Sequence, residues 1–339
     1  MKTKVARILS SVLACIVVLH GSAFSADQAT LEGAKKEGRL VFYSGIFESE
    51  ARTVISRFEQ KYPFIKTNLY RAGGVSLVSR IQNEHRAGSQ LWDVFNSAGL
   101  EGFVLLEQGF FAKYNSSEAK HFGAGFRDTD GFWTTMYATP YVATYNTRMV
   151  ATRDVPKDYF QLLEPQWSEK LAIDPEDIEW YANLKKIWGE EKTQKFFSGL
   201  AKQKVVIRRG RALQTDLLAA GEIAVLVNNY HHIAVRVKQR GGPVEWLAMD
   251  PVITAVGPIA INRLAPHPNA ARVFVDFCLS KEGQQILVQQ GRTSGRLDVN
   301  LNPLSEFKGV RVVPSDLKLG KTYVEARNEY ENLMGIRRK

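Results

Sequence analysis

The stretch GEIAVLVNNYHHIAVRV, residues 221–237, decides the fold class of this chain. It begins with a run of apolar, mostly β-branched residues, 223–227, which stops at the polar cluster Asn-Asn-Tyr-His-His, 228–232. A second apolar run with helical spacing follows and is closed by a pair of glycines. The pattern predicts a buried strand, a polar turn and a helix. Because open α/β sheets bind ligands at the carboxyl ends of their strands, the polar cluster, with Asn229, Tyr230 and His231, is a candidate binding site.

The segment from residue 39 to residue 99 alternates between short apolar strands and amphipathic helices. The predicted strands, 39–43, 65–70 and 92–95, each end in small or polar residues. Such alternation predicts a mainly parallel sheet with right-handed crossovers, so all three strand ends lie at one edge. The candidate ligand-binding residues at this edge are Ser44, Gly45, Gly73, Gly74, Ser76, Asn96 and Ser97.

Two long extended segments, 133–146 and 246–261, fit crossings between two domains better than strands of a single sheet. The sequence therefore predicts an α/β fold of two lobes, each a mainly parallel sheet flanked by helices. Such lobes close around a ligand by hinge motion. We expect lobe one to comprise 27–139 and 256–339, lobe two to comprise 144–250, and the hinge to lie near 139–143 and 248–257.

The N-terminus has the design of a secretory signal, residues 1–25. Basic residues precede an apolar run, 12–19, which is too short to span a membrane, and small residues follow it. We therefore expect a cleaved signal peptide and export to the periplasm. Cys15 lies inside the apolar run, so a lipoprotein anchor is the less favoured alternative. Cys278, on a predicted amphipathic helix, is expected to be a small buried core residue.

The formal net charge is +10, and removal of Lys2, Lys4 and Arg7 with the signal leaves about +7. A positive balance favours anionic partners. Nucleic acid is not expected, because the basic residues are spread out and no recognition motif accompanies them. We expect a monomer that binds a small molecule or an ion.

Enzyme motifs are missing from the sequence. It contains no GxSxG, no HExxH and no Walker-type phosphate loop. We therefore expect neither a catalytic residue nor a cofactor.

Two helix starts could bind an anion. Gly73-Gly74 precedes one helix, where unpaired N–H groups and the helix dipole favour negative charge. Arg208, Arg209 and Arg211 flank another, and one of them could grip a phosphate or carboxylate with two hydrogen bonds. The alternatives are an ordinary turn at the glycines and a solvated surface at the arginines. Trp180 either covers the ligand or packs within its own lobe.

Five segments occur in an order that resembles a known family: LVFYSG (40–45), GGVSLVSRIQNE (73–84), WDVFNSAG (92–99), ATPYVATYNTRMV (138–150) and LVNNY (226–230). Together with the signal peptide, they resemble the extracellular solute-binding proteins of ABC importers, with the type 2 periplasmic binding fold. The group that looks most similar contains the ferric-ion binders and their relatives for phosphorylated or other small anionic solutes, within extracellular solute-binding protein family 1.

The ferric binders of this family carry a tandem tyrosine at the corresponding strand end and a histidine after the first strand. Tyr230 matches the first tyrosine, His231 stands in the place of the second, and the turn 44–49 contains no histidine. Ferric iron favours phenolate and carboxylate oxygen, so the change weakens an iron site. If ferric ion is the transported ligand, we expect Tyr230, His231 and Glu48 to bind it, together with an exogenous anion.

The resemblance implies a periplasmic substrate-binding component that delivers a small anionic solute, phosphorylated or carboxylated, to an ABC permease in the inner membrane. Ferric iron is the alternative ligand. A ligand-sensing subunit for a membrane receptor is the alternative of another class.

Overall fold

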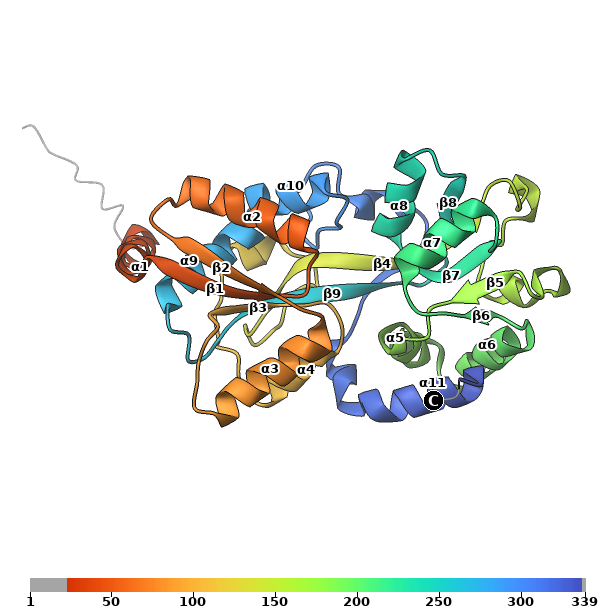
Figure 1. The fold of residues 1–339 in the computed structure, drawn as a ribbon, viewed down its shortest axis with the longest axis horizontal. Helices are drawn as coiled ribbons and strands as arrows, with labels where there is room; N and C mark the ends of the chain where they lie inside the picture. The colour runs from red at the N-terminus through yellow and green to blue at the C-terminus, as the bar shows by residue number, and fades with distance from the viewer. Residues whose placement is uncertain (1–22, 337–339) are drawn as a thin grey trace, which may run out of the picture.

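Two helix-flanked sheets joined by long strands make up the protein in the computed structural model, which describes residues 23–336 (Figure 1). The predicted fold class, a two-lobe α/β protein, is confirmed. Most of the predicted signal peptide, including Cys15, lies outside the described residues. Within them, no helix has the length and apolar character needed to cross a membrane.

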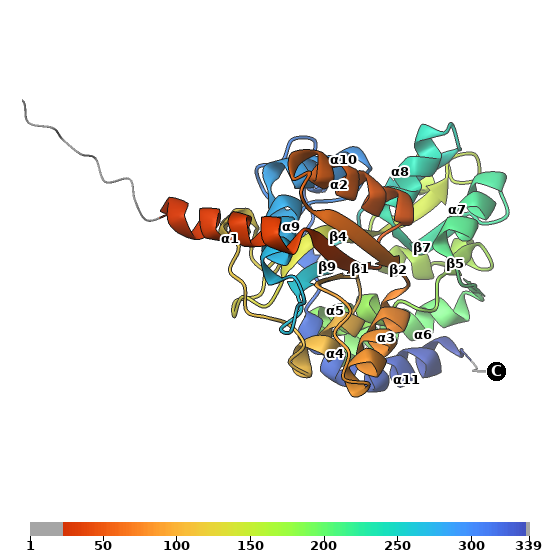
Figure 2. The ribbon, with the colours of Figure 1, turned by 60° about the vertical axis from the view of Figure 1, so that its left-hand side comes forward.

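Lobe one is a three-layer unit. Strands β1, β2 and β3 are parallel, and β9 is antiparallel to β3. Alternate residues of β1 enter different cores: Leu40 and Phe42 pack with α2, α9 and α10, whereas Tyr43 packs with α3 and α4. Figures 1 and 2 show α2 on one side of this sheet and α3 and α4 on the other. Its elements are α1 (Ala23–Glu37), β1 (Arg39–Ser44), α2 (Glu48–Lys61), β2 (Lys66–Arg71), α3 (Gly74–Arg86), β3 (Val94–Asn96), α4 (Glu101–Glu107), η1 (Ser117–His121), α9 (Pro268–Leu279) and α10 (Lys281–Gln289).

Lobe two repeats the three layers. Strand β5 pairs in parallel with β6 and β7. Leu171 and Ile173 of β5 face an aromatic core with α5 and α6, and Ala172 between them faces α7 and α8. Its elements are η2 (Thr152–Asp154), η3 (Phe160–Leu163), η4 (Pro165–Trp167), β5 (Leu171–Ile173), α5 (Ile178–Trp188), α6 (Glu190–Lys202), β6 (Val206–Ile207), α7 (Arg211–Ala220), β7 (Val225–Tyr230), α8 (His231–Gln239) and β8 (Val244–Leu247).

Two long strands, β4 (Thr134–Asn146) and β9 (Val252–Ile261), run through both lobes. Strand β4 pairs with β9 as far as Pro140 and with β7 from Tyr141 onward. Twelve of its 13 residues are buried. One strand therefore carries hydrogen bonds of both sheets, and its change of partner falls between the lobes.

The C-terminal region differs from the predicted lobe division, which assigned it wholly to lobe one. After η5 (Pro303–Glu306), β10 (Val312–Pro314) pairs with β9, and η6 (Leu317–Thr322) follows. Helix α11 (Tyr323–Met334) then packs on α5 and α6 of lobe two, where Tyr330 contacts Tyr181 and Phe197. The sequence of this helix contains many charged residues, so its pattern does not indicate which lobe its apolar face packs against.

The junction between β7 and α8 also differs from the expectation of a polar turn. The strand continues through Tyr230, and the helix begins at His231 without an intervening loop. The polar cluster is thus divided between two elements: residues 228–230 end the strand, and His231 and His232 begin the helix.

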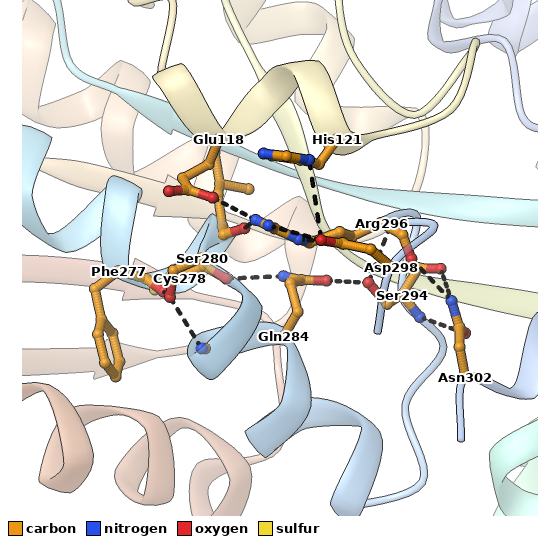
Figure 3. Close-up of polar contacts among 12 residues, drawn as sticks. Glu118, His121, Phe277, Cys278, Ser280, Gln284, Ser294, Arg296, Asp298 and Asn302 are labelled. Carbon is orange, nitrogen blue, oxygen red and sulfur yellow. Dashed lines mark hydrogen bonds and ion pairs between the residues drawn. The ribbon is translucent and has the colours of Figure 1, made fainter. Parts of the chain in front are cut away.

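A buried polar network fastens the segment after α10 to lobe one (Figure 3). The Arg296 side chain, 5% exposed, forms ion pairs with Glu118 and Asp298 and donates a 3.0 Å hydrogen bond to the Leu279 carbonyl. Gln284 donates to the carbonyls of Met136 (2.7 Å) and Cys278 (2.8 Å). The network closes around a guanidinium whose charge is compensated by two carboxylates.

Replacing Arg296 should destabilise the fold. Arg296→Met leaves the Leu279 carbonyl and two carboxylates without their donor, and we expect a loss of about 1.5–3 kcal/mol, as for hydrogen bonds to charged groups. The matched control is Arg311→Met, whose pair with Asp250 is exposed and screened by solvent and should therefore contribute much less. Urea unfolding of both variants measures the difference, and equal losses would contradict the assigned role.

Candidate functional site

A cavity of about 540 Å³ lies between the two lobes. Lobe one contributes the starts of α3 and α4, lobe two contributes the ends of β5 and β6 and the start of α5, and α11 forms a further wall. The lining residues are Val75, Glu101, Pro175, Glu176, Ile178, Ile207, Arg209, Tyr323, Arg327, Glu331 and Ile336. The cavity therefore lies where strand ends and helix starts of both lobes meet.

The polar side chains at the strand ends of lobe one form hydrogen bonds with the protein's own backbone. The Asn96 side chain is fully buried and donates to the carbonyls of Gly257 (3.2 Å) and Pro258 (3.0 Å) in β9. Ser44 Oγ lies 3.4 Å from Asn96 Oδ1 and accepts a 3.3 Å hydrogen bond from the Ile46 amide. These two predicted ligand-binding residues thus stabilise the edge of the sheet next to β9.

Two glycines of the predicted site make room for Ser97. A Cβ atom at Gly45 would lie 2.6 Å from Ser97 Oγ, and one at Gly74 would lie 2.8 Å from the same atom. The close approach of β1, α3 and the end of β3 therefore favours glycine at both positions, since a larger residue would displace the Ser97 hydroxyl. Gly73 has open space on its Cβ side, and Ser76 is exposed on the first turn of α3.

A carboxylate already occupies the start of α3. Glu101 Oε2 lies 3.5 Å from the position of a Cβ on Gly74, is shielded from solvent, and has no hydrogen-bond partner among residues 23–336. Burial raises the pKa of this carboxyl group. The helix start that was predicted to attract an anion from solution thus faces a negative side chain of the protein itself.

Arg211 and Tyr230 form a stacked pair at the lobe-two strand ends. The Arg211 guanidinium lies 3.9 Å from the centre of the Tyr230 ring, and its Nε donates a 3.2 Å hydrogen bond to the Asn228 carbonyl. It also forms an ion pair with Asp177, and Asp174 Oδ2 lies 3.9 Å away. Two acidic residues compensate its charge, so Arg211 positions Tyr230 and the start of α5.

The Tyr230 ring is partly buried and packs between aromatic neighbours. Tyr141 lies at a centroid distance of 5.2 Å and His232 at 5.7 Å. Burial raises the pKa of the Tyr230 hydroxyl, so the neutral phenol is favoured. Asn229 lies on the other side of the strand, where its amide donates to Thr144 Oγ1 (3.1 Å) and Thr215 Oγ1 (3.0 Å).

His231 points away from Tyr230 into an apolar pocket. Its ring centroid lies 4.6 Å from that of Trp246 and 5.2 Å from that of Phe307. The half-exposed carboxylate of Glu306 lies 3.7 Å from Nε2, and neither ring nitrogen has a hydrogen-bond partner among the described residues. Burial lowers its pKa to about 4. His232, the next residue, is the one that faces the other lobe, since its ring lies 6.5 Å from Phe47.

The ligand set expected for ferric ion does not come together. Glu48 lies on the exposed face of α2 in an ion pair with Arg52, and His231 lies in the apolar pocket described above. Within the described part of the chain, no group of three or more His, Cys, Asp or Glu side chains could hold a metal ion.

The remaining two predicted residues have opposite environments. Trp180 is 1% exposed and packs in the lobe-two core against Phe197 at 5.4 Å, which does not support its expected role as a cover over the ligand. Arg209, in contrast, lines the cavity, is 78% exposed and lies 3.2 Å from Glu176 Oε1.

Several cavity residues were missed from sequence. Glu101 follows the predicted strand end by only a few residues, and Glu176 lies in an acidic loop before Trp180, so their places in the chain could have suggested them. Tyr323 and Arg327 belong to α11, whose position beneath the cavity depends on long-range packing. Arg327 stacks on Tyr323 at 4.5 Å.

An ion-pair network joins the lobes on another side of the strand ends. Glu50 at the start of α2 accepts two hydrogen bonds from Arg292 (2.9 and 2.7 Å), and Arg236 Nη2 of α8 lies 3.3 Å from its other oxygen. Glu50 is 4% exposed and belongs to lobe one, whereas Arg236 belongs to lobe two. The Arg236–Glu50 contact therefore crosses the interface between lobes.

Two lobes around a shared cavity are compatible with a solute-binding protein, and sequence similarity shows that the chain is of this class. The chain belongs to the bacterial extracellular solute-binding proteins, whose family model matches residues 89–313. This confirms the resemblance inferred from sequence and places the chain among binding proteins, not enzymes. It is 27% identical over 282 residues to the major ferric iron-binding protein of Neisseria meningitidis. The aligned region covers 78% of this chain and 81% of that protein.

Solved structures share the fold. Iron-bound HitA from Pseudomonas aeruginosa has a TM-score of 0.75 and 23% identity, covering 86% of this chain and 99% of HitA. AfuA from Actinobacillus pleuropneumoniae, with exogenous fructose-6-phosphate bound, has a TM-score of 0.73 and 22% identity, covering 88% and 99%. Relatives of one fold thus bind an ion or a sugar phosphate.

Acid should destabilise the protein through His231. Its folded-state pKa of about 4 lies below the ordinary value, so the unfolded chain binds more protons between about pH 4 and about pH 6.5, and stability falls as pH drops through that window. At about pH 4.5 this group should lower the free energy of unfolding by about 2–3 kcal/mol relative to about pH 7. In His231→Phe, the free energy of unfolding measured with urea should fall less between about pH 7 and about pH 4.5 than in the wild type. An equal fall in both proteins would contradict the role of His231.

Removing Arg236 should favour separation of the lobes. Arg236→Met deletes the contact with Glu50 but leaves Arg292 in place. The equilibrium between closed and separated lobes should therefore shift toward separation by about 0.2–1 kcal/mol, as for a partly exposed ion pair. Distances between spin labels at the exposed positions 60 and 240, one in each lobe, should lengthen on average. Lys238→Met, which removes a pair with Glu245 inside lobe two, is the control and should leave the distances unchanged.

Proposed function

We propose that this chain is the periplasmic substrate-binding component of an ABC transporter, and that it captures a small anionic solute, phosphorylated or carboxylated, between its lobes. The observation that carries the proposal is the cavity of about 540 Å³ lined by both lobes and by α11. Pockets for small ligands have volumes of about 300–1,000 Å³ and combine apolar walls with a few charged groups. This cavity has both features.

Arg209 and Arg327 are the groups proposed to bind the anion. Both line the cavity, Arg209 from the loop after β6 and Arg327 from α11, and a guanidinium can donate two parallel hydrogen bonds to a phosphate or carboxylate. Arg209 is one of the two arginines expected from sequence. Arg211, the other, is already paired with Asp177, and in this proposal it shapes the wall beside the ligand.

Capture would proceed by hinge motion. The solute binds to one lobe, the lobes close by small changes in β4 and β9 where these strands change partners, and the closed form docks on the permease in the inner membrane. The protein acts as an exported monomer and needs no cofactor. No covalent chemistry is involved.

Ferric iron is the alternative ligand, because relatives with 27% identity carry the name of ferric iron-binding proteins. Tyr230 would then be the principal protein ligand, with oxygen atoms of a companion anion completing the coordination. A ligand-sensing subunit would use the same cavity, and a receptor in place of a permease would distinguish it.

Native mass spectrometry of the purified protein should reveal a retained anionic solute. Arg209→Ala and Arg327→Ala should each weaken its binding more than tenfold, since hydrogen bonds to charged groups contribute about 1.5–3 kcal/mol. Arg153→Ala, whose side chain is 88% exposed and not among the lining residues, is the matched control.

Unchanged affinity in both cavity variants would contradict the proposal that Arg209 and Arg327 bind the anion. Retained iron, with a tyrosinate absorption band that disappears in Tyr230→Phe, would establish the alternative instead. A protein that retains and binds no solute would refute the proposed function as a whole.

A further inference from the structure

Negative charge exceeds positive charge around the cavity. The charged lining residues are Glu101, Glu176, Glu331, Arg209 and Arg327, three carboxylates and two guanidinium groups. Arg209 lies 3.2 Å from Glu176 and compensates it. A solute bound only through an anionic group would add further negative charge to this set.

Glu101 is the carboxylate whose charge is least compensated. Its Oε2 atom is shielded from solvent and has no hydrogen-bond partner within residues 23–336. The backbone amide of Glu101 itself interacts with its carboxyl group, and Arg327, stacked on Tyr323, attracts it from a distance. A buried carboxylate is unfavourable unless a charge or a donor satisfies it, so a cationic group of the solute would stabilise the ionised form of Glu101.

A second unsatisfied carboxylate lies across the lobe boundary. Glu179, one residue after Ile178 of the cavity wall, is 6% exposed, and its Oε1 atom also has no hydrogen-bond partner in the described chain. It interacts electrostatically with Glu101, and this repulsion is added to the effect of burial. Burial raises the pKa of Glu179 to about 8, so its neutral form predominates at neutral pH, and Glu101 is the carboxylate that a bound cation would stabilise.

We infer that the solute carries an ammonium group in addition to its anionic group, and that Glu101 binds the ammonium. The inference rests on the proposed function and narrows its substrate class to small zwitterionic solutes. An ammonium is a compact cation with three donors and could satisfy a shielded carboxylate oxygen. Val75, Ile178 and Ile207 provide apolar surface for the carbon skeleton between the two charged ends.

The interaction also links ligand binding to lobe closure. Glu101 belongs to lobe one, whereas Arg209 and Glu179 belong to lobe two. A solute that pairs its ammonium with Glu101 and its anionic end with Arg209 contacts both lobes at once. A solute with an anionic end alone leaves the Glu101 carboxylate without a partner.

Paired probes test this inference by isothermal titration calorimetry. Each pair differs only in the amine: phosphoethanolamine against ethyl phosphate, and 4-aminobutyrate against butyrate. The amine-bearing member of at least one pair should bind at least tenfold more tightly than its partner. In Glu101→Gln that preference should disappear, because a neutral amide does not attract an ammonium.

Glu107→Gln is the matched control, because Glu107 lies at the other end of α4 and outside the cavity, 3.6 Å from Lys321. It should keep the wild-type preference. Thermal unfolding of both variants checks that they are folded, and Glu101→Gln removes an uncompensated charge, so it should be at least as stable as the wild type.

Equal or tighter binding of the amine-free members, or an unchanged preference in Glu101→Gln, would overturn the inference while leaving the proposed function intact. If no probe binds, the solute identified by native mass spectrometry decides: a retained solute with an amine supports the inference, and one without an amine refutes it. If no solute is retained either, both proposals fail.

Discussion

The hydrogen bonding of β4 is the constraint on which the rest of the structure depends. This strand pairs with β9 in lobe one and with β7 in lobe two, and it changes partner at Pro140 and Tyr141. Because the two sheets share a continuous strand, their parallel strands are held with carboxyl ends toward the same interface. Every candidate residue at those ends depends on that arrangement, including Ser97 in lobe one and Tyr230 in lobe two.

Local sequence patterns were sufficient for the architecture. The alternation of apolar strands with amphipathic helices predicts the layers of both lobes, since hydrophobic periodicity reports which face of each element is buried. The same patterns say little about α11. Its apolar residues alternate with charged ones, and the packing of Ala326, Tyr330 and Met334 against the lobe-two core determines where the helix lies.

The site was predicted less completely, for a physical reason. A sequence shows which residues end a strand but not the direction of each side chain. Asn96 and Asn229 were rightly placed at strand ends, yet their amides satisfy buried backbone and hydroxyl groups of the protein. His231 and His232 are adjacent in sequence, but at the start of a helix their side chains point in different directions. His231 packs beside Trp246, whereas His232 faces Phe47. Arg209 and Arg211 differ in the same way, since only Arg211 meets a buried acidic pair.

The C-terminal tail has a consequence for how the molecule can move. Besides β4 and β9, the segment that contains η6 crosses from one lobe to the other: Gly320 approaches Phe103 of α4, and α11 begins three residues later on lobe two. Two adjacent strands alone would permit the lobes to bend and also to twist about the strand axis. A third covalent link, set apart from the other two, acts as a tether that suppresses the twist. The tail therefore restricts the relative motions of the lobes to those that all three connections allow, and it also forms part of the cavity wall.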